Sequence, residues 1–303
     1  MLSESAAGVF TIAATPFLPD GALDLASVDR ATDFYVGAGA TGLTILGIMG
    51  EAGKLTQDEA LQVVTRVTAR AGIPVVVGVS APGFAAIEAL AKAAMDRGAA
   101  GVMVAPPGHL RTDAQITGYF RTVAEVLGDI PFVLQDFPLV TGVTLDPSVI
   151  LRIVEDCPTC VMLKHEDWPG LDKITTLRRA SDKGARRISI LCGNGGLFLP
   201  EEVARGADGA MTGFAYPEMM RDVVAAAKAG DMERAHDIFD IYLPLIRFET
   251  QPGLGLAIRK EVLARRGAIA HATVRRPGPK LTPETMAELD RLLVRLEARR
   301  GAQ

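Results

Sequence analysis

The sequence is poor in aromatic residues, cysteine and histidine, and it contains no long uninterrupted hydrophobic run. Only 5% of its 303 residues are aromatic, and it has 3 cysteines and 4 histidines. Three cysteines cannot all pair, and a chain of this length does not need disulfides to fold, so we expect a reducing, cytoplasmic environment. Polar residues, glycine or proline interrupt every apolar stretch before it reaches the length of a membrane span. No basic segment followed by an apolar one opens the chain, so we expect no secretory signal.

The charge balance also excludes whole classes of partner. A net charge of −4 leaves no basic excess for a nucleic acid or for an anionic membrane surface. Hydrophobic residues make up 49% of the chain and charged residues 22%, which permits a sizeable core and excludes overall disorder. We therefore expect a globular protein that binds neither nucleic acid nor membrane.

Cys157 and Cys160 form a CxxC pair, a spacing that is found in redox centres and zinc sites. No second CxxC motif and no HxxxH motif accompanies the pair, and it leads directly into an apolar run. The four histidines are scattered along the sequence. Because a zinc site needs a full set of ligands, we predict no metal site.

Eight short apolar runs recur along the first two thirds of the chain. They occupy residues 8–15, 42–46, 73–80, 101–105, 130–135, 160–164, 187–193 and 208–213. Segments with helical periodicity, such as 56–72 and 112–128, lie between them. Strands that alternate with helices predict parallel βαβ units. Apolar runs without polar alternation predict a sheet that is covered on both faces.

An eightfold repeat of this kind closes most naturally into a (β/α)8 barrel, an α/β fold. The alternative is an open doubly wound sheet, but no GxGxxG motif follows the first run to support it. From residue 217 the pattern is helical without strands, and Thr282 followed by Pro283 is typical of a helix start. We therefore expect a barrel over residues 1–216 and a helical extension packed against it over residues 217–303.

A barrel places candidate functional groups at the carboxyl ends of its strands, because the loops that follow the strands open on one face. Lys164 ends the sixth apolar run. Burial at this position disfavours the charged ammonium, and a neutral amine can form a Schiff base with a keto group. The alternative is a structural lysine whose ammonium group pairs with Glu166 at the mouth of the barrel.

Two other strand ends carry candidate groups. Gly47, Gly50 and Gly53 flank Glu51 after the second run. Glycines allow backbone N–H groups to approach a ligand closely, which suits carboxylate binding, although a tight turn between strand and helix is the simpler explanation. The stretch 135–138 (Gln-Asp-Phe-Pro) offers either polar contacts or ordinary turn chemistry.

These stretches together resemble the dihydrodipicolinate synthase and N-acetylneuraminate lyase family. GIMGE at 47–51 is similar to the family's GxxGE loop, and GADGAMTG at 206–213 is similar to its eighth strand segment. Lys164 lies where the family has its Schiff-base lysine. The resemblance covers nearly the whole chain. It implies a homotetramer of barrels that binds a 2-keto acid as an imine on Lys164 and needs no external cofactor.

The resemblance also implies roles for individual residues. The candidate substrate-binding residues follow the second and eighth strands: Gly47, Met49, Gly50, Met211 and Thr212. Among them, the backbone N–H groups of Met49 and Gly50 would hold the substrate carboxylate. Beside Lys164, the candidates for proton transfer are Glu51, Glu166, and Gln135 through a bound water molecule.

The sequence departs from the synthase branch of this family at several positions. Ile48 and Met49 replace the two threonines of its GTTGE loop, Gln135 replaces the tyrosine of its YNxP motif, and Val140 stands where synthases have an arginine. A glutamine amide cannot shuttle protons as a phenol does. The QDxP stretch, and Tyr216-Pro217 after GAMTG, are more like the branch that dehydrates 2-keto-3-deoxy sugar acids.

We therefore expect a Schiff-base lyase that acts on pyruvate or on a 2-keto-3-deoxy sugar acid such as 2-keto-3-deoxyarabonate. The reaction would be a dehydration, or an aldol cleavage or condensation, through an imine and an enamine. One alternative is 4-hydroxy-tetrahydrodipicolinate synthase activity on pyruvate and aspartate semialdehyde. Another is a non-catalytic barrel that binds a keto acid but has lost its proton relay.

Overall fold

The computed structural model describes residues 1–301, and eight parallel strands in it close into a barrel. The strands are β1 Gly8–Ile12, β2 Gly42–Ile45, β3 Val75–Gly78, β4 Gly101–Val104, β5 Phe132–Asp136, β6 Cys160–His165, β7 Ser189–Cys192 and β8 Gly209–Ala210. Each strand pairs with the next one along the chain, and β8 pairs with β1. Every strand lies within or overlaps one of the eight apolar runs, so the predicted (β/α)8 barrel is confirmed.

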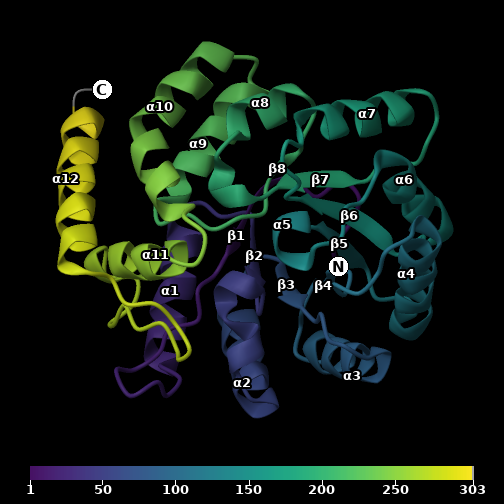
Figure 1. The fold of residues 1–303 in the computed structure, drawn as a ribbon, viewed down its shortest axis with the longest axis horizontal. Helices are drawn as coiled ribbons and strands as arrows, with labels where there is room; N and C mark the ends of the chain where they lie inside the picture. Colours follow the sequence, from purple (N-terminus) through teal and green to yellow (C-terminus); the bar gives the residue numbers. More distant parts are fainter. Residues whose placement is uncertain (302–303) are drawn as a thin grey trace.

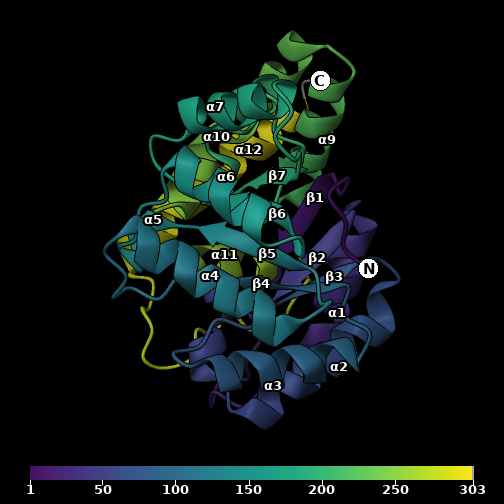
Figure 2. The ribbon, with the colours of Figure 1, turned by 90° about the vertical axis from the view of Figure 1, so that its right-hand side faces the viewer.

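Helices follow the strands and form a ring around the barrel (Figure 2). The ring contains α1 Leu25–Gly37, α2 Gln57–Ala71, α3 Phe84–Met95, α4 Asp113–Leu127, α6 Pro147–Asp156, α7 Leu171–Asp182, α8 Leu199–Ala204 and α9 Pro217–Lys228, and the single turn α5 Pro138–Thr141 lies in the loop after β5. Two of them begin with a capping box, in which Thr56 or Thr112 accepts a hydrogen bond from the backbone N–H three residues later. Short 3₁₀ turns, η1 Ile48–Gly50, η2 Ala52–Lys54 and η3 Asn194–Gly196, occupy loops after β2 and β7.

Alternation of side chains along the strands creates two hydrophobic clusters. The outer cluster lies between the strands and the helices. The inner cluster fills the barrel and consists of Leu2, Phe10, Ile12, Val76, Met103, Val133, Val161, Met162, Leu191 and Met211. Leu2 reaches the inner cluster because its N–H donates to the Ala100 carbonyl at 2.8 Å, at the start of β4. The barrel is therefore a packed core rather than a channel, as is typical of this architecture.

The last helices lie together on one side of the barrel, opposite α4 and α6 (Figure 1). They are α10 Met232–Glu249, α11 Gly255–Arg265 and α12 Pro283–Arg300. Helix α12 starts as predicted, since Thr282 accepts a hydrogen bond from the Thr285 N–H and Pro283 is the first helical residue. Helix α9 packs on β1 and β8 and therefore belongs to the ring. The predicted boundary at residue 216 thus falls between β8 and the ring helix that follows it, before the C-terminal helices begin. Within residues 1–301, no helix combines the length and the hydropathy that crossing a bilayer requires.

The CxxC cysteines belong to the core. Cys157 and Cys160 are free thiols, and both are fully buried in the outer cluster. Burial raises the pKa of the Cys157 thiol to about 11 and that of Cys160 to about 12. Since the thiolate is the reactive form, both groups are unreactive near neutral pH.

Candidate active site

Three polar side chains meet at the carboxyl ends of β5 and β6. Gln135 and Lys164 are partners in the strand register, and Glu166 directly follows β6. The Lys164 Nζ lies 2.8 Å from the Glu166 Oε2, and the Gln135 Nε2 donates to the same oxygen at 2.7 Å. All three residues are buried, and Lys164 is only 5% exposed. The structure therefore brings together three of the four residues predicted to be catalytic.

The period of a strand explains why these side chains lie on one face. Leu163, next to Lys164, belongs to the outer cluster. His165, on the other side, has its Nε2 3.0 Å from the Gly170 carbonyl in the loop after β6. Met162, two residues before Lys164, belongs to the inner cluster. Lys164 therefore continues the inner face of β6 beyond the apolar filling of the barrel.

Glu166 occupies space that a glycine leaves open. A Cβ atom at Gly193, which directly follows β7, would lie 2.1 Å from the Glu166 Cγ. The Gly193 N–H donates to the His165 carbonyl at 2.8 Å, so the backbone of the loop after β7 lies directly against the end of β6. Any larger residue at position 193 would displace the carboxylate from Lys164.

Asp136 points away from this cluster, because it is the strand neighbour of Gln135. It accepts a hydrogen bond from the Lys173 Nζ on α7 at 2.8 Å, and Lys173 also pairs with Asp167 at 2.6 Å. These contacts tie the loop after β6 to the end of β5. The two polar residues of the Gln-Asp-Phe-Pro stretch therefore differ in role. Gln135 faces Lys164 in the candidate site, whereas Asp136 makes structural contacts.

The loop after β2 is held by its neighbours. Its 3₁₀ turn is closed by a hydrogen bond from the Gly50 N–H to the Gly47 carbonyl at 3.0 Å. The Thr15 Oγ1, at the end of β1, donates to the Gly50 carbonyl at 2.5 Å. Met49 packs on the inner cluster, whereas Ile48 is 50% exposed. The Gly50 N–H already donates to the Gly47 carbonyl, so a substrate carboxylate bound there would have to share this donor with that carbonyl.

Glu51 is committed to a separate buried network. Its φ angle of 55° is left-handed, and its carboxylate accepts hydrogen bonds from Lys260 of α11, from the Lys54 Nζ at 2.8 Å and from the Arg275 N–H at 3.0 Å. Lys260 also donates to the Thr15 carbonyl at 2.7 Å and to the Thr273 carbonyl at 2.8 Å. Glu51 thus links the loops after β1 and β2 to the C-terminal helices, and its predicted part in proton transfer stays a prediction.

We expect Lys260→Met to destabilise the protein by about 3 to 5 kcal/mol, because it leaves the buried Glu51 carboxylate without its ion-pair partner on α11. Lys260 is fully buried, and burial lowers the pKa of its amine below the ordinary 10.5 although Glu51 acts in the opposite direction. Urea denaturation measures the effect. Lys228→Met, at the exposed end of α9, is the control and should change the free energy of unfolding by less than about 0.5 kcal/mol.

The substrate-binding candidates from β8 occupy two environments. Met211 is fully buried in the inner cluster. The Thr212 hydroxyl accepts a hydrogen bond from the Gly195 N–H in η3 at 2.8 Å. Thr212 therefore fixes the loop that contains Gly193, and it supports the Glu166 position from a second strand.

Glu202 on α8 is a buried carboxyl group that sequence reasoning missed. It is 5% exposed, and its Oε2 has no hydrogen-bond partner within residues 1–301. Burial raises the pKa of Glu202 from 4.5 to about 8, although a hydrogen bond with the Cys192 thiol acts in the opposite direction. The group is therefore protonated in the folded protein near neutral pH.

This pKa predicts a loss of stability as the pH rises. Between pH 4.5 and about 8 the unfolded chain ionises Glu202 while the folded protein keeps it protonated, so the free energy of unfolding falls, by on the order of 1 kcal/mol per pH unit. Glu202→Gln should remove this component of the pH dependence. Denaturation curves at pH 5 and pH 8 measure the difference, with Glu155→Gln at an exposed position of α6 as the control. If the free energy of unfolding depended on pH equally in Glu202→Gln and in the parent protein, the raised pKa of Glu202 would be contradicted.

Large apolar side chains are exposed on several loops that follow the strands. They are Ile48 after β2, Leu139 and Val140 after β5, Trp168 after β6 and Phe198 after β7. The Trp168 and Phe198 rings meet edge to face with centroids 5.1 Å apart. Val140, where synthases would have an arginine, is 55% exposed. These five residues, the apolar rim, expose apolar side chains on the segments that follow β2, β5, β6 and β7.

The residues that sequence reasoning missed are buried ionisable groups, of which Lys260 is a partner of the predicted Glu51. Lys173, Glu202 and Lys260 lie on helices, and their contacts depend on strands and loops far away in the sequence. For Lys260 a weak signal exists, since α11 shows little separation of polar and apolar faces, as is typical of a helix buried on most sides.

Comparisons with known proteins cover almost the whole chain. The sequence model of the dihydrodipicolinate synthetase family matches residues 5–296. The L-2-keto-3-deoxyarabonate dehydratase of Azospirillum brasilense is 33% identical over 96% of this chain and 94% of its own length. The 4-hydroxy-tetrahydrodipicolinate synthase of Methanothrix thermoacetophila is 29% identical over 95% of this chain and 96% of its own. A crystal structure of dihydrodipicolinate synthase from Rhodopseudomonas palustris is 56% identical, has a TM-score of 0.96 and covers 97% of this chain and 99% of that one.

Proposed function

This chain belongs to the dihydrodipicolinate synthetase family and is a lyase of that family, as its sequence predicted. From this membership, we propose that the protein acts on a 2-keto acid through an imine on Lys164. The observation that carries the proposal is the buried pair of Lys164 and Glu166 at the carboxyl end of β6. An amine at this position faces the mouth of the barrel, where substrates of such barrels bind.

The first steps use the geometry of this pair. Glu166 lies within hydrogen-bond distance of the Lys164 Nζ and can take a proton from it, which frees the lone pair. The amine attacks C2 of the keto acid, and the C2 oxygen leaves as water to give a protonated imine. The imine withdraws electrons from the C2–C3 bond, so a proton at C3 can be removed to form an enamine.

The protonated imine then has two routes. In dehydration, it loses a proton from C3, and the electrons of the resulting enamine expel the hydroxyl group from C4, which takes up a proton and leaves as water. In aldol cleavage, the protonated imine accepts the electrons of the C3–C4 bond, the C4 hydroxyl loses its proton as an aldehyde departs, and the enamine that remains takes up a proton at C3. Glu166 is our candidate for the proton transfers, with Gln135 holding its carboxylate in place at 2.7 Å. Hydrolysis of the imine returns Lys164 to the free amine.

We infer pyruvate or a 2-keto-3-deoxy sugar acid as the substrate class, and for the sugar acid, which has a hydroxyl group at C4, dehydration is the favoured reaction. Gln135 in place of the synthase tyrosine supports this inference, and so does the similarity to the Azospirillum dehydratase over 96% of the chain. The apolar rim favours a short 2-keto acid, because a long polyhydroxylated chain would lose hydrogen bonds to water without replacing them.

Turnover across a panel of 2-keto acids tests the proposal, with 2-keto-3-deoxyarabonate and pyruvate as its first members. We expect product formation from a 2-keto-3-deoxy acid, and after borohydride treatment the mass of the reduced ligand on Lys164. An unmodified Lys164 under conditions that label a known Schiff-base aldolase would exclude the imine. Thermal stabilisation by a keto acid without any turnover would instead favour the non-catalytic binding barrel.

A second candidate is 4-hydroxy-tetrahydrodipicolinate synthase activity. The names of the Methanothrix and Rhodopseudomonas relatives favour it. The absence of a cationic side chain at Val140 opposes it, because the carboxylate of aspartate semialdehyde would meet an apolar residue there. A coupled assay with pyruvate and aspartate semialdehyde distinguishes the two, and we expect turnover well below that with a 2-keto-3-deoxy acid.

A further inference from the structure

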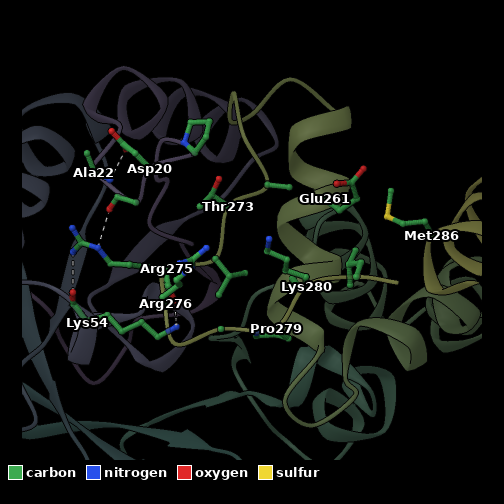
Figure 3. A pocket seen from close by; sticks show the side chains of 17 residues that line it. Asp20, Ala22, Lys54, Glu261, Thr273, Arg275, Arg276, Pro279, Lys280 and Met286 are labelled. Atoms are coloured by element: carbon green, nitrogen blue, oxygen red, sulfur yellow. Dashed lines mark hydrogen bonds between the residues drawn. The ribbon is translucent and has the colours of Figure 1, made fainter. Parts of the chain in front are cut away.

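A cavity of about 1100 Å³ lies between the C-terminal helices and the loop after β1 (Figure 3). On one side are Asp20 and Ala22, on the other are Glu261 of α11 and Met286 of α12, and the segment 272–281 crosses between them. None of the residues around Lys164 lines this cavity. Its volume is in the range of small-molecule sites in proteins.

The lining of the cavity is basic in a chain whose net charge is −4. Its charged residues are the cations Lys54, Arg275, Arg276 and Lys280 and the carboxylates Asp20 and Glu261. Both carboxylates have partners outside this set: Asp20 accepts a hydrogen bond from the Ala22 N–H at 2.9 Å, and Glu261 accepts one from the Arg265 Nε at 2.7 Å. Glu261 is thus paired with a cation outside the lining, and the four cations still outnumber the two carboxylates.

Two of the cations are available to a ligand. Arg276 and Lys280 make no hydrogen bond and no ion pair with any other part of the chain from residue 1 to 301, and both are exposed. The residues between them are Pro277, Gly278 and Pro279, and the two prolines restrict the backbone of the turn. The turn thus presents a planar guanidinium fork and an ammonium group to one space from a restricted backbone.

The other two cations, Lys54 and Arg275, are bound to other parts of the chain and form one wall of the cavity. The Arg275 guanidinium binds both oxygens of Glu59 on α2, at 2.7 and 2.5 Å, and also the carbonyls of Gly21 and Lys54. This contact lowers the pKa of Glu59 to about 2, so the pair is charged at neutral pH. The wall beside Arg276 is therefore anchored to the barrel.

We propose that this cavity binds a small molecule with two or more anionic groups, phosphate or carboxylate, held by Arg276 and Lys280. A doubly charged ligand matches two separate cations better than a single anion does, because each charge-assisted hydrogen bond adds to affinity. The apolar liners Val274, Leu281 and Met286 give room for a carbon skeleton between the anionic groups.

The site is coupled to the loop after β2 through Glu51, and this coupling rests on the function proposed above. The Arg275 N–H donates to the Glu51 carboxylate at 3.0 Å, and the Lys54 Nζ bridges the Arg275 carbonyl and Glu51, both at 2.8 Å. A ligand on Arg276 therefore contacts the residue next to Arg275, whose N–H holds Glu51 at the end of the Gly47–Gly50 turn. Binding in the cavity then changes the affinity for the keto acid, and the keto acid changes binding in the cavity by the same factor.

Isothermal titration calorimetry with pyrophosphate and with citrate tests the site, since these probes separate phosphate from carboxylate chemistry. We expect at least one probe to bind with one site per chain, and Arg276→Ala/Lys280→Ala to weaken it by about tenfold or more. The matched control is Arg179→Ala/Lys183→Ala at the end of α7, a pair of exposed cations with the same four-residue spacing, which should leave binding unchanged. No binding of either probe, or equal loss in both double variants, would overturn the proposal.

Borohydride trapping with pyruvate, with and without the better probe, tests the coupling. We expect the half-saturating pyruvate concentration to change by about fivefold or more in the parent protein and not in Arg276→Ala/Lys280→Ala. An unchanged value with the probe bound would reject the coupling to Glu51. If no adduct forms even without the probe, the imine proposal fails, while the calorimetric result still decides the anion site.

Discussion

Lys164→Ala is expected to abolish both the borohydride-trapped adduct and the turnover of 2-keto acids, with a loss of at least about 10⁴-fold in kcat/KM. The reason is chemical, since no other amine is placed to form an imine in the buried cluster with Glu166 and Gln135. Turnover of a 2-keto-3-deoxy acid and the mass of the trapped protein measure the two effects.

Lys164→Arg separates the nucleophile from the ion pair. An arginine keeps a positive charge beside Glu166 but cannot form the imine, so we expect this variant to be as inactive as Lys164→Ala. Lys183→Ala, at an exposed position directly after α7, is the control and should keep the full adduct. Residual activity above about a hundredth of the parent value in either Lys164 variant would show that the reaction does not need an imine at this residue.

Glu166→Gln is expected to lower turnover by about 10² to 10⁴-fold while the folded structure is kept. A glutamine has nearly the same shape and fills the space beside Gly193, but it cannot accept a proton from the Lys164 Nζ or from C3 of the substrate. Exchange of the pyruvate methyl protons with deuterium, followed by NMR, isolates the C3 step from bond cleavage and should slow by a similar factor.

The neighbouring Asp167→Asn provides the matched control for this prediction. Asp167 is the next residue of the same loop and pairs with Lys173 rather than with Lys164. We expect its exchange rate to stay within about threefold of the parent value. Exchange at the parent rate in Glu166→Gln would assign the proton transfer to another group, and Glu51 or a water molecule on Gln135 would then be tested in the same way.

The barrel was predictable because its signals are local. Each strand is a short apolar run between helical segments, and the number of runs fixes the architecture. The start of α12 was predictable for the same reason, since Thr282 and Pro283 are adjacent to it. Local sequence patterns of this kind require no knowledge of tertiary contacts.

The candidate site was predictable only in part. The position of Lys164 at a strand end follows from the strand pattern, and the inward direction of Gln135 and Glu166 follows from alternation. The partners of Glu51 do not, because Lys260 and Arg275 are more than two hundred positions away in the sequence. A single sequence carries no signal for such pairs, and only the closed barrel brings them together.

The contacts of Lys260 also determine how late in synthesis the loop after β2 can reach its final structure. Ribosomes deliver the chain from its N-terminus, and domains begin to fold as they emerge. The turn that ends at Glu51 emerges from the ribosome early. The hydrogen-bond donors to the Glu51 carboxylate, Lys260 on α11 and the Arg275 N–H, emerge only after most of the polypeptide has been made. A nascent chain that has completed all eight strands therefore needs about 65 more residues, up to Arg275, before Glu51 has these donors.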